Sequence, residues 1–390
     1  MKNLYTPRMF PFSLEAPRAI HFGAGAIEKL GDIAAACGSR VLLVTGSRSL
    51  AASPWTRQID AQLSGLTIRR LVCPPGEPST SSLAHALDDA ASSAPDLLVA
   101  VGGGSVLDTA KALSALLRFG GPADRFLEGV SGSEAVPGPC IPWVAVPTTA
   151  GTGAEVTKNS VVRAESLGVK RSMRSAFLLA HAVIVDPRLT LTLPLSVTGT
   201  SGLDALTQLV EAYVTKKSNP YVRSIVEGAF APMLNALQEL PRDLGDIEQR
   251  SKASYGALVS GLALANAGLG AAHGFAAGIG GLFEVPHGLV CAVMLPSVLE
   301  ANREVVGRDL ETLVASCGDT APSGRTAVSW LAGRVRELLD AFELPRDLRG
   351  FHIPAERIRE IAEKSSGSSM NGNPRELGVA EREQMLARII

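Results

Sequence analysis

The sequence predicts an α/β amino-terminal half built on a parallel sheet and an all-helical carboxyl-terminal half. Three observations carry this prediction. Short apolar, β-branched runs alternate with amphipathic stretches in the first half, and a glycine-rich turn follows one of these runs. After Leu193 and Pro194 the strand pattern disappears and long helical windows take its place.

The expected strands are short and continuously apolar, which is typical of strands buried on both faces of a parallel sheet. They cover residues 40–45, 67–72, 96–101, 143–146 and 182–186. His21 lies in a further strand-like segment.

The expected helices cover residues 202–215, 222–239, 249–267, 325–342 and 354–364. We expect helices to start or stop at the prolines at 220, 241, 296, 345 and 354. We therefore expect one domain over 1–195 and a second over 196–390, with an uncertainty of several residues in the boundary.

Composition narrows the class of protein. Hydrophobic residues make up 46%, charged residues 19%, and the net charge is −1, so nothing favours nucleic acid or an anionic membrane as a partner. We see neither an apolar run of about 18 residues nor the apolar core of a signal peptide, and we expect a cytoplasmic enzyme. The five cysteines contain no C-x-x-C pair, so we expect buried thiols.

A strand, a three-glycine turn and a helix start follow one another over residues 96–111. Glycines let the backbone approach a pyrophosphate, and a helix amino terminus favours its charge. We predict that Gly102, Gly103, Gly104 and Ser105 contact a dinucleotide. A purely structural turn is the alternative, because neither G-x-G-x-x-G nor a Walker A pattern is present.

A second polar loop follows the strand at 143–146. Thr148, Thr149 and Thr152 offer hydroxyl groups at the carboxyl edge of a sheet, where α/β proteins bind ligands. An ordinary Ser/Thr turn is the alternative.

Four residues of the second half have the spacing of a divalent-metal site. Asp204 and Gln208 lie four apart, so both can face one point from a helix. His273 and His287 lie 14 residues apart in a glycine-rich stretch. Two imidazoles and a carboxylate suit Zn²⁺ or Fe²⁺. The alternative makes the histidines core or capping residues.

Taken together, these segments resemble the iron-containing (group III) alcohol dehydrogenases, which are related in fold to glycerol dehydrogenase and dehydroquinate synthase. The resemblance rests on segments 22–25, 102–111, 147–157, 186–194, 202–206 and 286–288, which run in the family's order across almost the whole chain. It implies a dinucleotide-binding domain that includes Asp108, a helical metal domain, a catalytic cleft between them and a homodimer.

The resemblance also implies metal ligands at Asp204, Gln208, His273 and His287, of which only Gln208 departs from the family's histidine. A further histidine that relays protons is replaced by Ala277. A site of Asp204, His273 and His287, with Gln208 assisting, is similar to that of glycerol dehydrogenase, so we expect Fe²⁺ or Zn²⁺.

The cofactor expected is NAD(P)(H), with a mild preference for NADP(H). The second strand ends in Gly46, Ser47 and Arg48, where relatives that prefer NAD often place an acidic residue. Gly46 removes the repulsion of a 2′-phosphate, which Ser47 or Arg48 can hold. A solvent-exposed Arg48 is the alternative.

The expected activity is hydride transfer between the nicotinamide and an alcohol or aldehyde carbon, assisted by the metal, with Asp204, His273 and His287 at the catalytic centre. Three alternatives remain open. They are a metal-independent reductase of the same fold for an anionic aldehyde or keto acid, similar to maleylacetate reductase; a carbon–oxygen lyase of the dehydroquinate synthase type; and an inactive nucleotide-binding protein.

Overall fold

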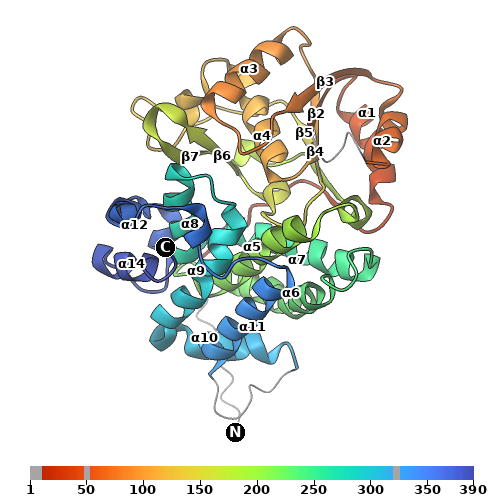
Figure 1. Cartoon of the computed structure of the whole chain (residues 1–390). Coiled ribbons are helices and arrows are strands. Elements are labelled where there is room, and N and C mark those ends of the chain that lie inside the picture. The colour runs from red at the N-terminus through yellow and green to blue at the C-terminus, as the bar shows by residue number, and fades with distance from the viewer. Residues whose placement is uncertain (1–10, 48–52, 319–325) are drawn as a thin grey trace.

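The computed structural model describes residues 11–47, 53–318 and 326–390. A sheet with its covering helices forms one part of the molecule, and helices alone form the other (Figure 1). This arrangement confirms the predicted fold class.

The main sheet has six strands, all parallel, in the order β1-β8-β5-β4-β2-β3. A separate antiparallel pair, β6 and β7, was not predicted. The strands are β1 Ile20–Phe22, β2 Arg40–Gly46, β3 Thr67–Cys73, β4 Leu97–Gly102, β5 Trp143–Pro147, β6 Asn159–Ala164, β7 Val169–Arg174 and β8 Ala182–Val185.

Helices cover both faces of the sheet, which explains why its central strands are continuously apolar. Alternate residues of one strand enter different cores. Val99 packs with α1 Leu30–Cys37 and α2 Trp55–Leu63, whereas Leu98 packs with α3 Thr80–Ala91 and α4 Gly104–Phe119.

After β8 the described residues contain helices and no strand. The helices are α5 Leu195–Val214, α6 Pro220–Glu239, α7 Ile247–Ala267, α8 Ala271–Leu282, α9 His287–Ala301, α10 Arg303–Ala315, α11 Ala327–Ala341, α12 Ile358–Lys364, α13 Ser368–Gly372 and α14 Val379–Leu386. Among the described residues no single helix has the length and apolar character of a membrane span, and only α7 and α8 taken together, across a 94° bend, meet that criterion.

The start of one helix and the position of one proline differ clearly from the sequence prediction. The helix α5 begins at Leu195 rather than 202, although its first turns are rich in Ser, Thr and Gly. Tertiary contacts outweigh this low propensity, as where buried Arg250 donates to Thr198 Oγ1 at 2.9 Å. Pro296 lies inside α9, not at a helix end, because the apolar residues on both sides of it are packed in the core.

A buried ionic network ties α4 to the loop before β6. Lys111 Nζ donates to Thr157 Oγ1 at 2.8 Å, to the Asn159 carbonyl at 2.7 Å and to Asp108 Oδ1 at 3.2 Å. Glu155 lies close by and is 3% exposed, and burial raises the pKa of its carboxyl group to about 7. The stability of the folded protein therefore depends on whether this carboxyl group is protonated.

We expect Glu155→Gln to remove a pH-dependent loss of stability. The folded pKa of Glu155 is raised above its unfolded value, so its contribution is fully present below pH 4.5 and is lost as the pH rises towards 7. At pH 8 the variant should therefore be more stable than the parent by up to about 3 kcal/mol. Urea unfolding between pH 4.5 and 8 measures this difference, and the exposed Glu356→Gln is the matched control. Parallel pH profiles for parent and Glu155→Gln would contradict the expectation.

Candidate metal centre and cofactor edge

The carboxyl ends of β2, β4 and β5 lie at one edge of the sheet. Thr45 pairs with Val101 and Gly102 pairs with Pro147, so the segments that follow these strands start at one level. The chain leaves β2 for β3 on one side and returns to β4 on the other, which makes a topological switch point between β2 and β4. Ligands of open α/β sheets bind in the crevice at such a point.

Two segments pack against each other at this edge: the glycine turn, residues 102–104, and the threonine loop, residues 148–153. A Cβ atom at Gly103 would lie 3.2 Å from Thr149 Cγ2, and one at Gly104 would lie 2.7 Å from Thr152 Oγ1. The absence of a side chain at Gly103 and Gly104 thus permits this close packing, in addition to the dinucleotide contact predicted for them. Thr148 Oγ1 is buried and has no hydrogen-bond partner among the described residues, so it is an available contact for a bound molecule.

The other predicted cofactor residues are spread along the same edge. Ser105 is half-buried in the first turn of α4, Gly46 ends β2 and Ser47 is exposed, while Arg48 lies outside the described residues. The carboxylate of Asp108 accepts from Lys111 Nζ and from the Val161 amide at 3.1 Å, so both of its oxygens have protein partners.

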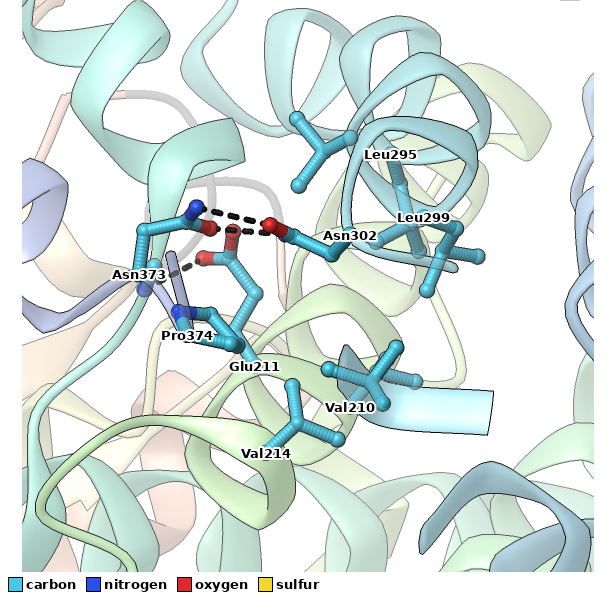
Figure 2. A pocket seen from close by; sticks show the side chains of 11 residues that line it. Val210, Glu211, Val214, Leu295, Leu299, Asn302, Asn373 and Pro374 are labelled. Atoms are coloured by element: carbon cyan, nitrogen blue, oxygen red, sulfur yellow. Dashed lines mark hydrogen bonds between the residues drawn. The ribbon is translucent and has the colours of Figure 1, made fainter. Parts of the chain in front are cut away.

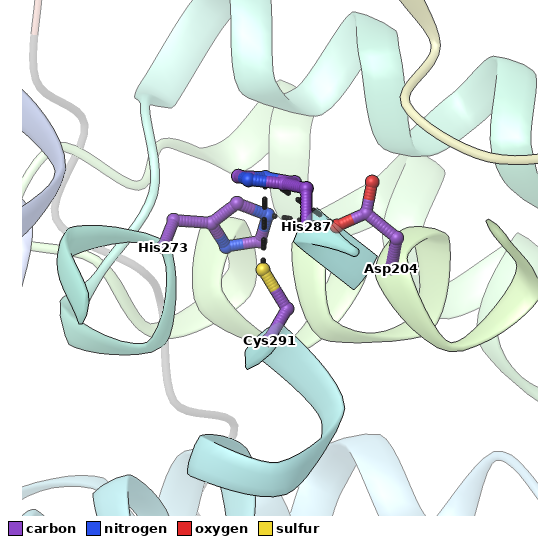
Figure 3. A group of neighbouring side chains, drawn as sticks. All are labelled: Asp204, His273, His287 and Cys291. Carbon is purple, nitrogen blue, oxygen red and sulfur yellow. Dashed lines mark hydrogen bonds and ion pairs between the residues drawn. The ribbon is translucent and has the colours of Figure 1, made fainter. Parts of the chain in front are cut away.

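Asp204, His273 and His287 converge on one point, as their spacing predicts, and Cys291 joins them (Figure 3). One donor atom from each residue lies within 4.8 Å of the other three. His273 Nε2 is 3.3 Å and His287 Nε2 3.8 Å from Asp204 Oδ1, and Cys291 Sγ is 3.7 Å from His287 Nε2.

Three helices bring these side chains together. Asp204 lies in the middle of α5, His273 in the first turn of α8, and His287 and Cys291 in the first turns of α9. Helix α9 can press against α5 because residue 288 is glycine: a Cβ atom there would lie 3.0 Å from Asp204 Cβ and would collide with the Thr200 carbonyl.

Glu211, two turns after Asp204 on α5, holds His273 in place. Its carboxylate accepts from the amides of Gly270 at 3.0 Å and Ala272 at 2.6 Å, and so caps the amino terminus of α8. The same carboxylate lies 2.7 Å from His273 Nδ1, which directs Nε2 towards Asp204.

A small cavity lies behind this carboxylate (Figure 2). Its volume is about 10 Å³, about the space of one water molecule. Asn302 and Asn373 line it and exchange two hydrogen bonds of 2.9 Å. The packing behind Glu211 therefore leaves no room for a cofactor.

Gln208, the doubtful fourth ligand, uses its amide elsewhere. Its Oε1 accepts from Ser260 Oγ of α7 at 2.8 Å, and its Nε2 donates to the Thr152 carbonyl at 3.3 Å. The side chain therefore links α5 to α7 and to the threonine loop. Its role as a metal ligand stays a prediction.

Close contacts within the cluster shift the pKa values of Asp204 and His273 in opposite directions. Burial raises the pKa of Asp204, but the close imidazoles of His273 and His287 outweigh it and hold this pKa below its usual value. Burial lowers the pKa of His273, yet Cys291, Asp204 and Glu211 raise it well above its usual value.

The other two members of the cluster favour their neutral forms in the absence of a metal. Burial lowers the pKa of His287, and it raises the pKa of the Cys291 thiol to about 12. Asp204 Oδ1 and His273 Nε2 are buried and have no well-formed hydrogen bond among the described residues. An ionised carboxylate and an imidazole that face one point fit a divalent cation.

Sequence reasoning missed Cys291 and Glu211. The spacing of four between His287 and Cys291 places both on one helix face, but the signal is usable only once a helix is known to begin at His287. Glu211 lies two turns after Asp204 on the same face of α5, but its partners lie about 60 residues further along the chain.

Comparison with known proteins agrees with this architecture. The profile described as "Iron-containing alcohol dehydrogenase" matches residues 17–187, and that of the "Fe-containing alcohol dehydrogenase family, C-terminal" matches residues 198–390. A crystal structure of 1,3-propanediol oxidoreductase superposes with a TM-score of 0.91 at 27% identity, covering 98% of this chain and 100% of that one.

Two curated relatives are similar over most of their length. The probable alcohol dehydrogenase EutG of Escherichia coli is 34% identical over 74% of this chain and 75% of its own. The NADPH-dependent butanol dehydrogenase of Clostridium saccharobutylicum is 28% identical over 97% of each chain. This chain belongs to the iron-containing alcohol dehydrogenase family, and it is an NAD(P)(H)-dependent oxidoreductase of the alcohol dehydrogenase type.

We expect Glu211→Gln to weaken metal binding by about 10–100-fold, because the amide no longer favours the correct orientation and basicity of His273. The amide oxygen can still accept from Ala272, so the fold should persist. Titration of the metal-free protein with Zn²⁺ measures the loss, and Glu239→Gln at the exposed end of α6 is the control for removal of one charge. Equal zinc affinity of Glu211→Gln and parent would refute the role of Glu211.

Proposed function

We propose that this iron-containing alcohol dehydrogenase transfers a hydride between the nicotinamide of NAD(P)(H) and the carbon of an alcohol or aldehyde, at a divalent cation held by Asp204, His273 and His287. The observation that carries the proposal is the pair of buried donors, Asp204 Oδ1 and His273 Nε2, which face each other at 3.3 Å without well-formed hydrogen bonds. When bound there, a divalent cation supplies Lewis acidity that polarises the substrate oxygen and lowers the pKa of an alcohol.

In this proposal the remaining side chains orient the reactants. Glu211 fixes the ring of His273, and the half-exposed His287 marks the side from which a substrate enters, since 31% of its side chain is accessible while Asp204 is 2% exposed. Thr148, with its unpaired buried hydroxyl, and the amino terminus of α4 bind the cofactor at the sheet edge.

The proton leaves the alcohol through water. Ala277 offers no titratable group, but it is exposed one turn after His273 on α8, so solvent reaches this side of the site. Lys170 and Glu77, paired at 2.6 Å, are the charged groups of the sheet part that act on His287. These two charged side chains make the entrance beside His287 polar.

The substrate class follows from the family and from the names of relatives, such as the long-chain-alcohol dehydrogenase 1 of Geobacillus thermodenitrificans, which is 30% identical over 88% of each chain. We assign a small-molecule alcohol or aldehyde. We further assign a mild preference for NADP(H), because Gly46 and Ser47 place no carboxylate at the end of β2.

Three further assignments belong to this proposal. The chain works as a homodimer in the cytoplasm, in keeping with the family resemblance. Its two domains, 1–195 and 196–390, meet between the end of β8 at Val185 and the start of α5 at Leu195. A catalytic cleft lies between them.

We expect His287→Ala to lose bound metal and at least about 99% of NADPH-dependent aldehyde reduction together, because one of three proposed ligands is removed. Elemental analysis and an assay on a panel of aldehydes, before and after chelation, measure both properties. The exposed His85→Ala is the control. Metal-free parent protein with undiminished turnover would make the chain a metal-independent reductase and assign His273 and His287 to substrate binding.

We expect Gly46→Asp to shift cofactor choice towards NADH. A carboxylate at the end of β2 repels a 2′-phosphate and can accept from a 2′-hydroxyl group. The ratio of kcat/KM for NADPH to that for NADH should fall by about tenfold or more, which corresponds to about 1.4 kcal/mol. Gly65→Asp adds the same charge in an exposed position before β3 and should leave the ratio unchanged. An unchanged ratio in Gly46→Asp would place the ribose elsewhere.

A further inference from the structure

The fourth donor of the cluster is a thiol that the family resemblance does not supply. The resemblance gives four protein ligands, and this chain has Gln208 in place of one of them. The structure adds Cys291 Sγ to Asp204, His273 and His287. Four potential donors are thus still present, from a different set of positions.

We propose that Cys291, as a thiolate, is the fourth protein ligand of the metal, in place of residue 208, and that it makes the site select Zn²⁺ over Fe²⁺. This inference rests on the proposed function, in which Asp204, His273 and His287 hold the cation. It adds Cys291 to these three protein ligands, so that a substrate oxygen would enter as a fifth ligand.

Three of the separations between donor atoms are close to those expected around one metal ion. Bonds of about 2.0–2.1 Å to nitrogen or oxygen and about 2.3 Å to sulfur place neighbouring donors about 3.3–3.5 Å apart. The observed separations are 3.3 Å from His273 Nε2 to Asp204 Oδ1, 3.8 Å from His287 Nε2 to Asp204 Oδ1, and 3.7 Å from Cys291 Sγ to His287 Nε2. Shifts of a few tenths of an ångström bring these three separations into the expected range, and each of the four donor atoms lies within 4.8 Å of the others.

The position of Cys291 favours this role. It follows His287 by one turn on α9, so one rigid helical segment presents both donors. Its side chain is 0% exposed, and its Sγ lies 3.7 Å from His287 Nε2. The amino termini of α8 and α9 lie at the cluster, and their dipoles favour the negative charge of a thiolate.

Gln208 is the less suitable donor because its amide is engaged. Its carbonyl oxygen accepts from Ser260 and its nitrogen donates to the Thr152 carbonyl. To bind a cation, the side chain would give up contacts that join α5 to α7 and to the threonine loop. An amide carbonyl is also a neutral donor, whereas a thiolate brings one negative charge.

Binding is an exchange of a proton for a metal bond, with no change of oxidation state. The S–H bond of Cys291 breaks as the sulfur–metal bond forms, and the proton passes to water. A soft thiolate shifts a site of imidazole and carboxylate ligands towards zinc. The parent protein should therefore release more protons per metal bound than a variant without the thiol.

The experiment uses the full-length, metal-free protein titrated with Co²⁺, a coloured substitute for Zn²⁺. The parent should develop the near-ultraviolet absorption of thiolate-to-cobalt charge transfer. Cys291→Ser should bind cobalt without this band, and its zinc affinity should fall by more than about tenfold, the loss that even an outer-shell change produces. Cys37→Ser, a half-buried thiol in the sheet part, and Gln208→Leu should both keep the band.

X-ray absorption of the zinc-loaded parent is the second measurement, and it needs no variant. It should contain one sulfur neighbour at about 2.3 Å. Competition between Zn²⁺ and Fe²⁺ should favour zinc in the parent more strongly than in Cys291→Ser. Thermal melting of the metal-free variants checks that they are folded.

The outcomes separate the two proposals. Cobalt bound without the charge-transfer band, or zinc without a sulfur neighbour, while His287→Ala still abolishes binding, would overturn the role of Cys291 and leave the proposed function standing. No binding by the parent, or full binding by His287→Ala, would instead overturn the metal site on which both proposals rest.

Discussion

The threonine loop between β5 and β6 is the contact on which the relation between the two ligand-binding regions depends. On one side Thr149 and Thr152 fill the space left by glycines 103 and 104. On the other side the backbone of Gly153 lies directly against that of Gly261 in α7, closer than any Cβ atom would allow, and Thr152 accepts from Gln208. One short segment thus fixes the sheet edge relative to the helix that carries Asp204, and a hydride can pass only between groups held at a set separation.

The contact with the threonine loop uses the amide group of Gln208, which can donate and accept a hydrogen bond at the same time. As a ligand it would be poor, but as a linker it satisfies a hydroxyl of α7 and a carbonyl of the loop at once. The negative charge that a cation requires then comes from Asp204 on α5 and, by our proposal, from the thiolate on α9. In this proposal the ligand role of residue 208 on α5 passes to Cys291 on α9, and Gln208 links helices instead.

Local patterns were enough to predict the layered fold, the strands that enter it and three of the clustered side chains. Short apolar runs bounded by turn residues, such as residues 97–102, fit a strand in a sheet that is covered on both faces. The β6–β7 pair was missed because Lys170, Arg171 and Arg174 interrupt any apolar run there. Cys291 and Glu211 were missed because their meaning depends on where α8 and α9 begin, and tertiary packing decides that.

Glu211 couples the formation of one helix to the geometry of the proposed metal site. One carboxylate closes the amino terminus of α8 and sets the tautomer of a proposed ligand, so a substitution there damages a helix start and a metal site in the same step. Gln208 also has two partners, Ser260 and the Thr152 carbonyl, but neither of them is a proposed ligand. The geometry of the proposed site is therefore built into the start of α8, and not into the donor side chains alone.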